Sequence, residues 1–266
     1  MIRDQETVKE EKKNKTFEDD IRSNLRGFAR SIPSFIMAYG DENLNLSNFD
    51  QYVDDNVFED VTGVSLADFM FLRDGGYYTN DEGVEEHFDG GLFNDVVFDE
   101  SITEFIRLKS ELSNYFEDLD EDIYDYIPPQ NTNQIYTPKW VVKKMVDALE
   151  LESPGIYDDS TKTFIDLYMK SGLYITEVVT RLYNSEIIKR DLPDDDERLK
   201  HILENQVYGL APTEIIYRIA TSFIFGERTD GISKKNFVCL DAQPYTEDGT
   251  LEAKLDEVFG TWVWFD

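Results

Sequence analysis

The sequence predicts a mixed α/β protein in which an acidic, mainly helical region precedes an open parallel sheet flanked by helices. Before Pro128-Pro129, apolar residues recur at helical spacing in several short segments. After these prolines, apolar runs of strand length alternate with helix-length amphipathic segments, a pattern typical of β-α-β units. With 266 residues, of which 41% are hydrophobic, the chain can bury a substantial core.

The charge balance limits the possible partners. The 56 acidic and 26 basic residues give a net charge of -30, which repels the nucleic-acid backbone, so we expect the chain alone to bind DNA poorly. No apolar run approaches the length of a membrane span, and Met1 to Lys15 lacks the apolar core of a signal peptide, so we expect a cytoplasmic protein without membrane contact. The single Cys239 and the distant His87 and His201 form no metal-ligand pattern, so no metal site is expected.

The N-terminal part divides into a tail and a helical region. Residues 1–20 mix both charges with few apolar side chains and are interpreted as a charged tail. From Ile21 to Tyr39 the apolar spacing is helical, and Pro33 predicts a break between two helices.

Further helices and turns follow along this acidic region. The spacing of apolar residues from Leu46 to Leu72 predicts several short helices, with Ser65 as an N-cap. The glycine pairs Gly75-Gly76 and Gly90-Gly91 predict turns around a polar segment. Phe93 to Leu112 returns to helical spacing and predicts a longer helix.

A run of carboxylates from Glu117 to Asp125, closed by Pro128-Pro129, predicts a boundary between the two regions. A solvated helix end or linker explains such a run. A site for a basic protein partner, or mimicry of DNA by the carboxylates, remains an alternative explanation.

The second region predicts a parallel sheet with right-handed crossovers, whose ligands lie at the carboxyl ends of the strands. The predicted elements alternate in type. They are a helix from Lys139 to Glu150, a strand from Thr163 to Leu167, a helix from Ile175 to Ile188, a strand from Gln206 to Leu210, a helix from Thr213 to Phe225 and a strand from Asn236 to Leu240.

The central candidate site is the segment Phe164 to Ile175, an apolar strand that ends in Asp166 and leads through a turn containing Gly172 into a helix. A carboxylate at a strand end can accept hydrogen bonds from a ligand, and glycine lets the backbone approach that ligand closely. An ordinary strand-to-helix turn without a ligand has the same pattern.

Two other segments belong to the same hypothesis. At Tyr136-Thr137-Pro138, Thr137 can cap the following helix while Pro138 occupies its first turn, which leaves backbone N–H groups for a carboxylate. The alternative is a helix start with no ligand. The other segment is the strand from Asn236 to Leu240 that precedes Asp241, and Cys239 within it is interpreted as a small core residue.

These segments resemble the motifs of adenine-N6 DNA methyltransferases. Phe164 to Ile175 resembles motif I, with Asp166 and Gly172 in register, Asn133 to Val142 resembles motif X, and Asn236 to Ala242 resembles motif III. Motif X before motif I is the order of the gamma class. The wider sequence resembles large restriction-modification polypeptides in which a helicase-like motor precedes the methyltransferase.

The resemblance implies a partial Rossmann-like, S-adenosylmethionine-dependent methyltransferase fold. Residues 21–126 would be the connector to the motor and 127–266 the N-terminal half of the methyltransferase domain. DNA would be bound through regions downstream of this half. The cofactor-binding residues implied are Tyr136, Thr137, Pro138, Asp166, Tyr168, Ser171, Gly172 and Asp241.

The chain departs from the family at several positions. Lys170 replaces a motif I glycine and Leu167 the usual proline, and Ala211 stands where an acid normally binds the ribose hydroxyls, a role that Glu214 could take. No Asn-Pro-Pro-Tyr-like catalytic tetrapeptide occurs in the sequence. In this family the final Phe265-Asp266 opens the strand that leads to that motif, so we expect a fragment truncated before it, without catalytic residues and inactive alone.

Three functional hypotheses remain open at this stage. The chain is a fragment of an adenine methyltransferase that contributes the S-adenosylmethionine-binding half, or a non-catalytic methyltransferase-like scaffold that lost its cofactor through Lys170 and Ala211. The third hypothesis is an acidic DNA mimic that binds a basic protein.

Overall fold

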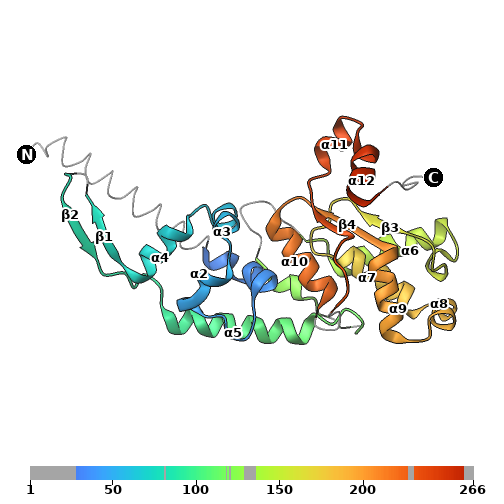
Figure 1. The fold of residues 1–266 in the computed structure, drawn as a ribbon. Coiled ribbons are helices and arrows are strands. Elements are labelled where there is room, and N and C mark those ends of the chain that lie inside the picture. The colour runs from blue at the N-terminus through green and yellow to red at the C-terminus, as the bar shows by residue number, and fades with distance from the viewer. Residues whose placement is uncertain are drawn as a thin grey trace, which may run out of the picture. The chain divides into compact units, whose positions relative to one another are not determined.

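The computed structural model describes residues 28–80, 82–117, 119, 121–128, 136–226 and 231–260 (Figure 1). Its contacts divide the chain into two compact units. The described residues of the first unit fall within 28–107 and 127–128, and those of the second within 108–126 and 136–260. The predicted tail at 1–20, residues 21–27 and the final Phe265-Asp266 lie outside the described residues.

The first unit contains short helices and one β-hairpin. Residues 28–39 are helical. They are followed by η1 (Leu46–Asn48), α2 (Phe49–Tyr52), α3 (Asp55–Thr62), α4 (Leu66–Asp74), β1 (Gly76–Thr79), β2 (Glu85–Phe88) and α5 (Asp95–Leu112), of which the last turns belong to the second unit.

A cluster of phenylalanine rings forms the core of this unit. Phe28 contacts five of them, with ring centroids between 4.9 and 5.7 Å apart. Aromatic rings bury a large apolar area, which lets a unit of short helices hold together. The members of the cluster are Phe28, Phe35, Phe49, Phe58, Phe69, Phe93 and Phe98.

The predicted break at Pro33 is wrong, because residues 28–39 form one uninterrupted helix. Phe35 and Ile36, two and three residues after the proline, are fully buried in the core. Packing of these side chains offsets the backbone hydrogen bond that proline cannot donate. The predicted N-cap is confirmed, since the Ser65 side chain accepts from the backbone N–H of Asp68.

The two glycine pairs enclose a hairpin. Strands β1 and β2 pair antiparallel with Gly76 opposite Phe88. Gly75 and Gly90 both have positive φ, and a Cβ on either would lie 2.4 Å or less from backbone atoms across the base of the hairpin. Only glycine fits such a close approach, so these pairs fix where the hairpin leaves the helices.

The second unit contains a parallel sheet with strand order β3-β4-β5. The strands are β3 (Phe164–Asp166), β4 (Val207–Ala211) and β5 (Phe237–Cys239). The helices are η2 (Ile123–Tyr126), α6 (Lys139–Glu152), η3 (Ile156–Asp158), α7 (Leu173–Asn184), α8 (Glu186–Asp191), α9 (Asp195–His201), a π-helical turn η4 (Ile202–Gln206), α10 (Glu214–Phe225), α11 (Gln243–Glu247) and α12 (Leu251–Phe259).

Helices cover both faces of this sheet. Helices α7 and α10 pack against one face. On the other face Leu210 packs with Leu255 of α12, and the rings of Tyr208 and Phe259 lie 5.3 Å apart. Side chains alternate between the two faces along each strand, and both faces are covered. Each strand is therefore a continuous apolar run in the sequence, as predicted.

The predicted alternation of strands and helices in this unit is confirmed. One predicted helix is divided, because Ser185 ends α7 and caps α8 by accepting from the N–H of Ile188. The protein is therefore a mixed α/β structure with small sheets and a high helix content.

Candidate functional site

The carboxyl ends of the three parallel strands meet at one edge of the sheet. The register places Asp166 opposite Gly209, and Ala211 opposite Cys239. Asp241 follows two residues after Cys239. The strands β3 and β5 are two spacings apart, about 10 Å, so a ligand that touched both Asp166 and Asp241 would have to be extended across the sheet.

Asp166 is a partly buried carboxylate at the end of β3. Its Oδ1 accepts a hydrogen bond of 3.0 Å from the backbone N–H of Tyr168. Burial raises the pKa of Asp166 above its usual value of 3.8, and this single backbone bond only partly opposes the rise. The same carboxylate contributes to a raised pKa of Tyr174 in the first turn of α7, after burial of that ring. Asp166 therefore costs folding free energy when ionised, which favours a role in binding over one in stability.

The loop after Asp166 is fixed at its centre by Met169. Its backbone N–H donates to the carbonyl of Leu210 over 2.7 Å, and its side chain is fully buried. Beside it, Tyr168 is 49% exposed and Lys170 places its Nζ 5.6 Å from the centre of the Tyr168 ring. In this cation-π pair, Lys170 stands at the position where motif I, which this segment resembles, has a glycine.

Gly172 ends the loop and starts α7 with a φ of 84°. A Cβ there would lie 3.0 Å from Cγ1 and 3.1 Å from Cδ1 of Ile224 in α10. The expected reason for this glycine was close approach of the backbone to a ligand. In the structure the missing side chain instead allows α7 to begin directly against α10.

Tyr124 connects the predicted motif X to the predicted motif I. Its buried hydroxyl donates to the carbonyl of Ser171, and its ring lies 4.7 Å from the ring of Tyr136. The Ser171 hydroxyl accepts from the N–H of Leu173. These contacts bring Tyr136 close to Ser171 and Gly172. The carbonyl and hydroxyl of Ser171 are both engaged in hydrogen bonds that hold the loop in place.

Tyr124 has no role in the sequence interpretation, although it lies within the acidic run before the prolines. The one signal is its position as an aromatic residue between carboxylates, in the apolar set with Leu119, Ile123 and Tyr126. Ile123 and Tyr124 are buried in the second unit, so this part of the run is not only a solvated linker.

The start of α6 differs from the prediction. Pro138 holds the N-cap position with a ψ of 142°, and no side chain caps the helix. The predicted cap by Thr137 is wrong, because the helix begins one residue later and Thr137 is exposed. The first N–H groups of α6 therefore lack a side-chain cap, which is the condition for carboxylate binding at a helix start.

The ends of β4 and β5 contribute less polar chemistry. Ala211 is fully buried. The Asp241 Oδ1 accepts from the N–H of Gln243 over 3.0 Å. Glu214 at the start of α10 forms an ion pair with Arg218 over 2.8 Å.

Cys239 is exposed, so its interpretation as a core residue is wrong. It stands at the last position of β5, where its side chain points toward Glu214 instead of the packed interior. Partial burial and the neighbouring Glu214 raise the pKa of the Cys239 thiol.

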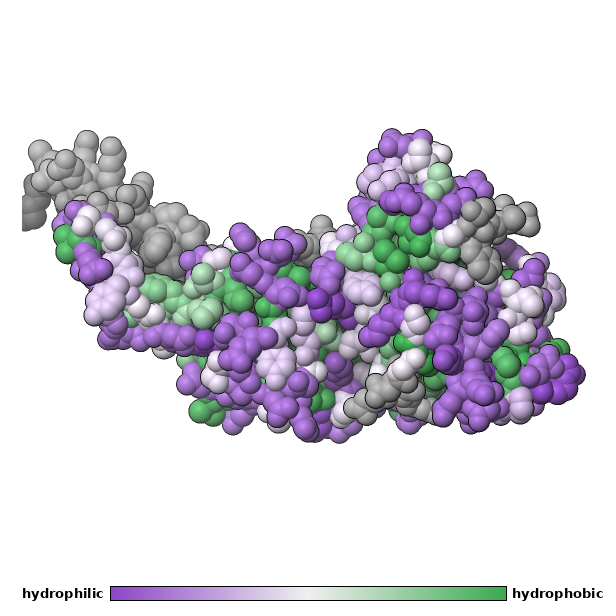
Figure 2. Space-filling model, in the orientation of Figure 1, coloured by the Kyte–Doolittle hydropathy of each residue, from purple (hydrophilic) through white to green (hydrophobic). Residues whose placement is uncertain are grey.

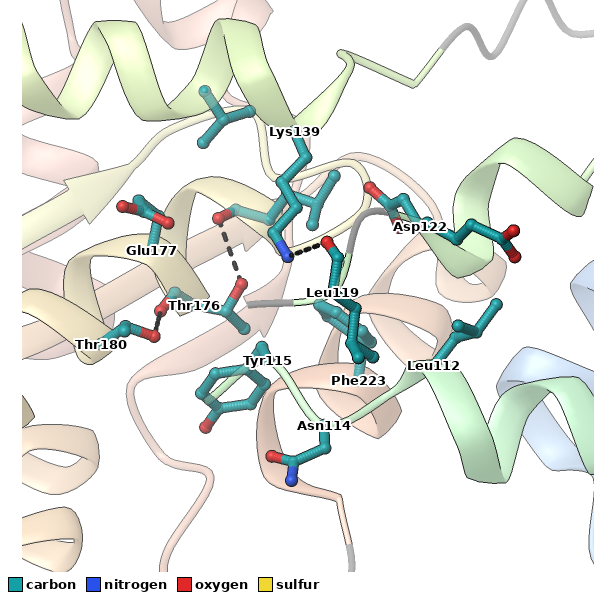
Figure 3. A pocket seen from close by; sticks show the side chains of 13 residues that line it. Leu112, Asn114, Tyr115, Leu119, Asp122, Lys139, Thr176, Glu177, Thr180 and Phe223 are labelled. Atoms are coloured by element: carbon teal, nitrogen blue, oxygen red, sulfur yellow. Dashed lines mark hydrogen bonds between the residues drawn. The ribbon is translucent and has the colours of Figure 1, made fainter. Parts of the chain in front are cut away.

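A small hollow lies beside the candidate residues, between α6, α7 and the segment that precedes η2 (Figure 3). Lys139 reaches across it and donates to the Leu119 carbonyl over 3.3 Å. Burial raises the pKa of Asp122 on its wall. Lys139 and Leu173 on its lining are sequence neighbours of Pro138 and Gly172, but the hollow contains none of the predicted cofactor-binding residues.

Within the described part of the chain, no group of three or more His, Cys, Asp or Glu side chains is arranged to hold a metal ion. The same residues include no helix that is both long and apolar enough to cross a membrane. Comparison with known protein families, curated proteins and solved structures finds no match to this chain.

Proposed function

We propose that this chain supplies the S-adenosylmethionine-binding half of a cytoplasmic adenine-N6 DNA methyltransferase with a partial Rossmann-like fold. The observation that supports this proposal best concerns Asp166 and the loop that follows it. Burial of the Asp166 carboxylate at the end of β3 destabilises the ionised form. Tyr124 contacts both this loop, through the Ser171 carbonyl, and the ring of Tyr136. These are the two segments that the resemblance assigns to motifs I and X.

The residues present fit the cofactor in part. The Asp166 carboxylate can accept from its ammonium group, and the uncapped start of α6 can donate to its carboxylate. Asp241, two residues after β5, is proposed to contact the adenine end of the cofactor. Ala211 offers no acid to the ribose hydroxyls. When bound, the cofactor would supply an electrophilic methyl group for transfer to an adenine amine.

DNA is proposed as a substrate that reaches this half through other regions of the enzyme. The net charge of -30 opposes direct binding of a polyanion. A catalytic Asn-Pro-Pro-Tyr-like motif, which this sequence lacks, would also have to come from outside the 266 residues.

A second candidate is a methyltransferase-like scaffold that binds no cofactor. The contact between the Lys170 ammonium and the Tyr168 ring favours it, because both residues belong to the loop that a cofactor would approach. A positive charge there also repels a sulfonium group.

Calorimetric titration of the full chain with S-adenosylmethionine tests the proposal. We expect measurable binding that Asp166→Asn weakens about tenfold, because one charge-assisted hydrogen bond is lost. The matched control is Asp159→Asn, since Asp159 precedes β3 at the opposite edge of the sheet and holds only the N–H and hydroxyl of Thr161.

No binding by the folded chain, or an equal loss in both variants, would refute cofactor binding at this edge. Binding gained only after Lys170→Gly would instead support the scaffold. That variant removes the ammonium and leaves the buried Met169 in place.

A further inference from the structure

The hairpin of the first unit has one packed face and one open face. On the packed face the Phe71 ring of α4 lies 5.2 Å from the Phe88 ring and 6.2 Å from the Tyr78 ring. The open face carries Tyr77, Thr79, Glu85 and His87, which share one side because residues two apart in a strand do so. We name these four residues the open hairpin face.

The open hairpin face exposes two aromatic side chains, Tyr77 and His87. Tyr77 is 72% exposed, and its ring lies edge-on to the opposite His87 ring at 4.8 Å. Val84, beside Glu85, is 52% exposed. Strands of four residues in a two-stranded sheet are marginally stable alone. A large exposed aromatic residue on such a ribbon is typical of a protein-binding surface.

The surrounding charge is almost entirely negative. Residues 31–73 contain eight Asp and Glu and residues 74–106 contain ten, so these 76 positions carry 18 carboxylates. Arg30 and Arg107 flank this range, and the one Lys or Arg inside it is Arg73. Its guanidinium is already engaged by Asp50 at 2.5 Å and Asp74 at 2.7 Å. Figure 2 shows apolar surface beside hydrophilic surface along the hairpin.

This charge decides which partner fits. Nucleic acids and anionic membranes are repelled by it, and a second copy of the chain would bring the same carboxylates together. We propose that the open hairpin face binds a basic segment of another protein, with a Lys or Arg over the Tyr77 ring and paired with Glu85. A cation over the Tyr77 ring gains a cation-π contact, and the Glu85 carboxylate on the same face pairs with its charge. This proposal does not depend on cofactor binding in the second unit.

The test is fluorescence anisotropy of a labelled dodecapeptide of alternating Lys and Val, titrated with the full chain at about 50 mM salt, where exposed charges are little screened. We expect saturable binding that Tyr77→Ala or Glu85→Lys weakens about tenfold. The matched controls are Leu151→Ala and Glu152→Lys, an exposed large apolar side chain and an exposed carboxylate in the second unit. They should leave the affinity unchanged.

Hydrogen exchange of the wild-type chain provides a second measurement that needs no variant. The peptide should slow exchange at residues 76–88. Absence of binding, equal losses in both pairs of variants, or protection elsewhere would overturn the proposal. Equal losses would mean attraction to the net charge alone, and tighter binding of duplex DNA than of the peptide would also refute it.

Discussion

Replacement of Gly172 by alanine tests the junction on which the candidate site is built. The backbone there has a φ of 84°, in the left-handed region, where a residue with a Cβ loses about 1 kcal/mol or slightly more. The added Cβ would also meet Cγ1 and Cδ1 of Ile224 at 3.0 and 3.1 Å and the Ala220 carbonyl at 3.3 Å. Overpacking of this kind costs about 1–3 kcal/mol. Together these effects predict a loss of about 2–4 kcal/mol for Gly172→Ala.

A second glycine in the same unit separates the two effects. Gly155 has nearly the same φ, 81°, and a Cβ there meets no atom within 4 Å. Gly155→Ala should therefore lose only the backbone part, about 1 kcal/mol. Ile224→Val removes Cδ1, so it should recover part of the additional loss when combined with Gly172→Ala.

Hydrogen exchange at the buried strand Val207–Ala211 measures these losses in the second unit alone. That readout avoids a single unfolding curve for a chain with two units. Equal losses for the two glycine variants, or no recovery with Ile224→Val, would refute the packing role of Gly172.

Three other changes test neighbouring parts of the site. Tyr124→Phe should destabilise β4 by about 1–2 kcal/mol in the same exchange measurement, because the buried Ser171 carbonyl loses its donor. Tyr126→Phe should have almost no effect, because the Tyr126 hydroxyl is exposed and bonded to Glu121. Equal effects of the two variants would contradict the link between the two segments. Folding raises the pKa of Asp166, so the protonated carboxyl contributes stability below the unfolded pKa, near 3.8, and this stability is lost as the pH rises through the folded pKa. Asp166→Asn should therefore stabilise the second unit at neutral pH. The difference in stability between the variant and the wild type should vanish in acid. Asp159→Asn should instead destabilise the unit at neutral pH, because hydrogen bonds from Thr161 lower the pKa of Asp159. Denaturation at a series of pH values measures both variants, and a stability change of the same sign in both would refute this reasoning. Cys239 should react with iodoacetamide in the native chain, and Glu214→Gln should speed the reaction at pH 8 by lowering the thiol pKa; mass spectrometry showing protection of the thiol would contradict its exposure.

The sequence by itself determined the order and kind of most elements in both units. Apolar periodicity marks α5, α6, α7 and α10, and short apolar runs mark β3, β4 and β5, because burial on one face of a helix or both faces of a strand leaves a regular pattern. Local chemistry was readable too, as the cap at Ser65 shows. The candidate residues at the strand ends follow from this pattern, since parallel strands place their carboxyl ends at one edge.

The tertiary structure decided whatever depends on contacts between distant segments. Pro33 lies inside a helix because the phenylalanine core holds both of its sides. Tyr124 donates to the carbonyl of Ser171 across 47 positions of sequence, and Gly172 lies against Ile224, which no local pattern encodes. The strands of the hairpin are equally hard to predict, because each has four residues that are mostly exposed and so leave no clear apolar alternation in the sequence. Glycine and proline mark where the chain turns, whereas packing alone decides what each turn brings together.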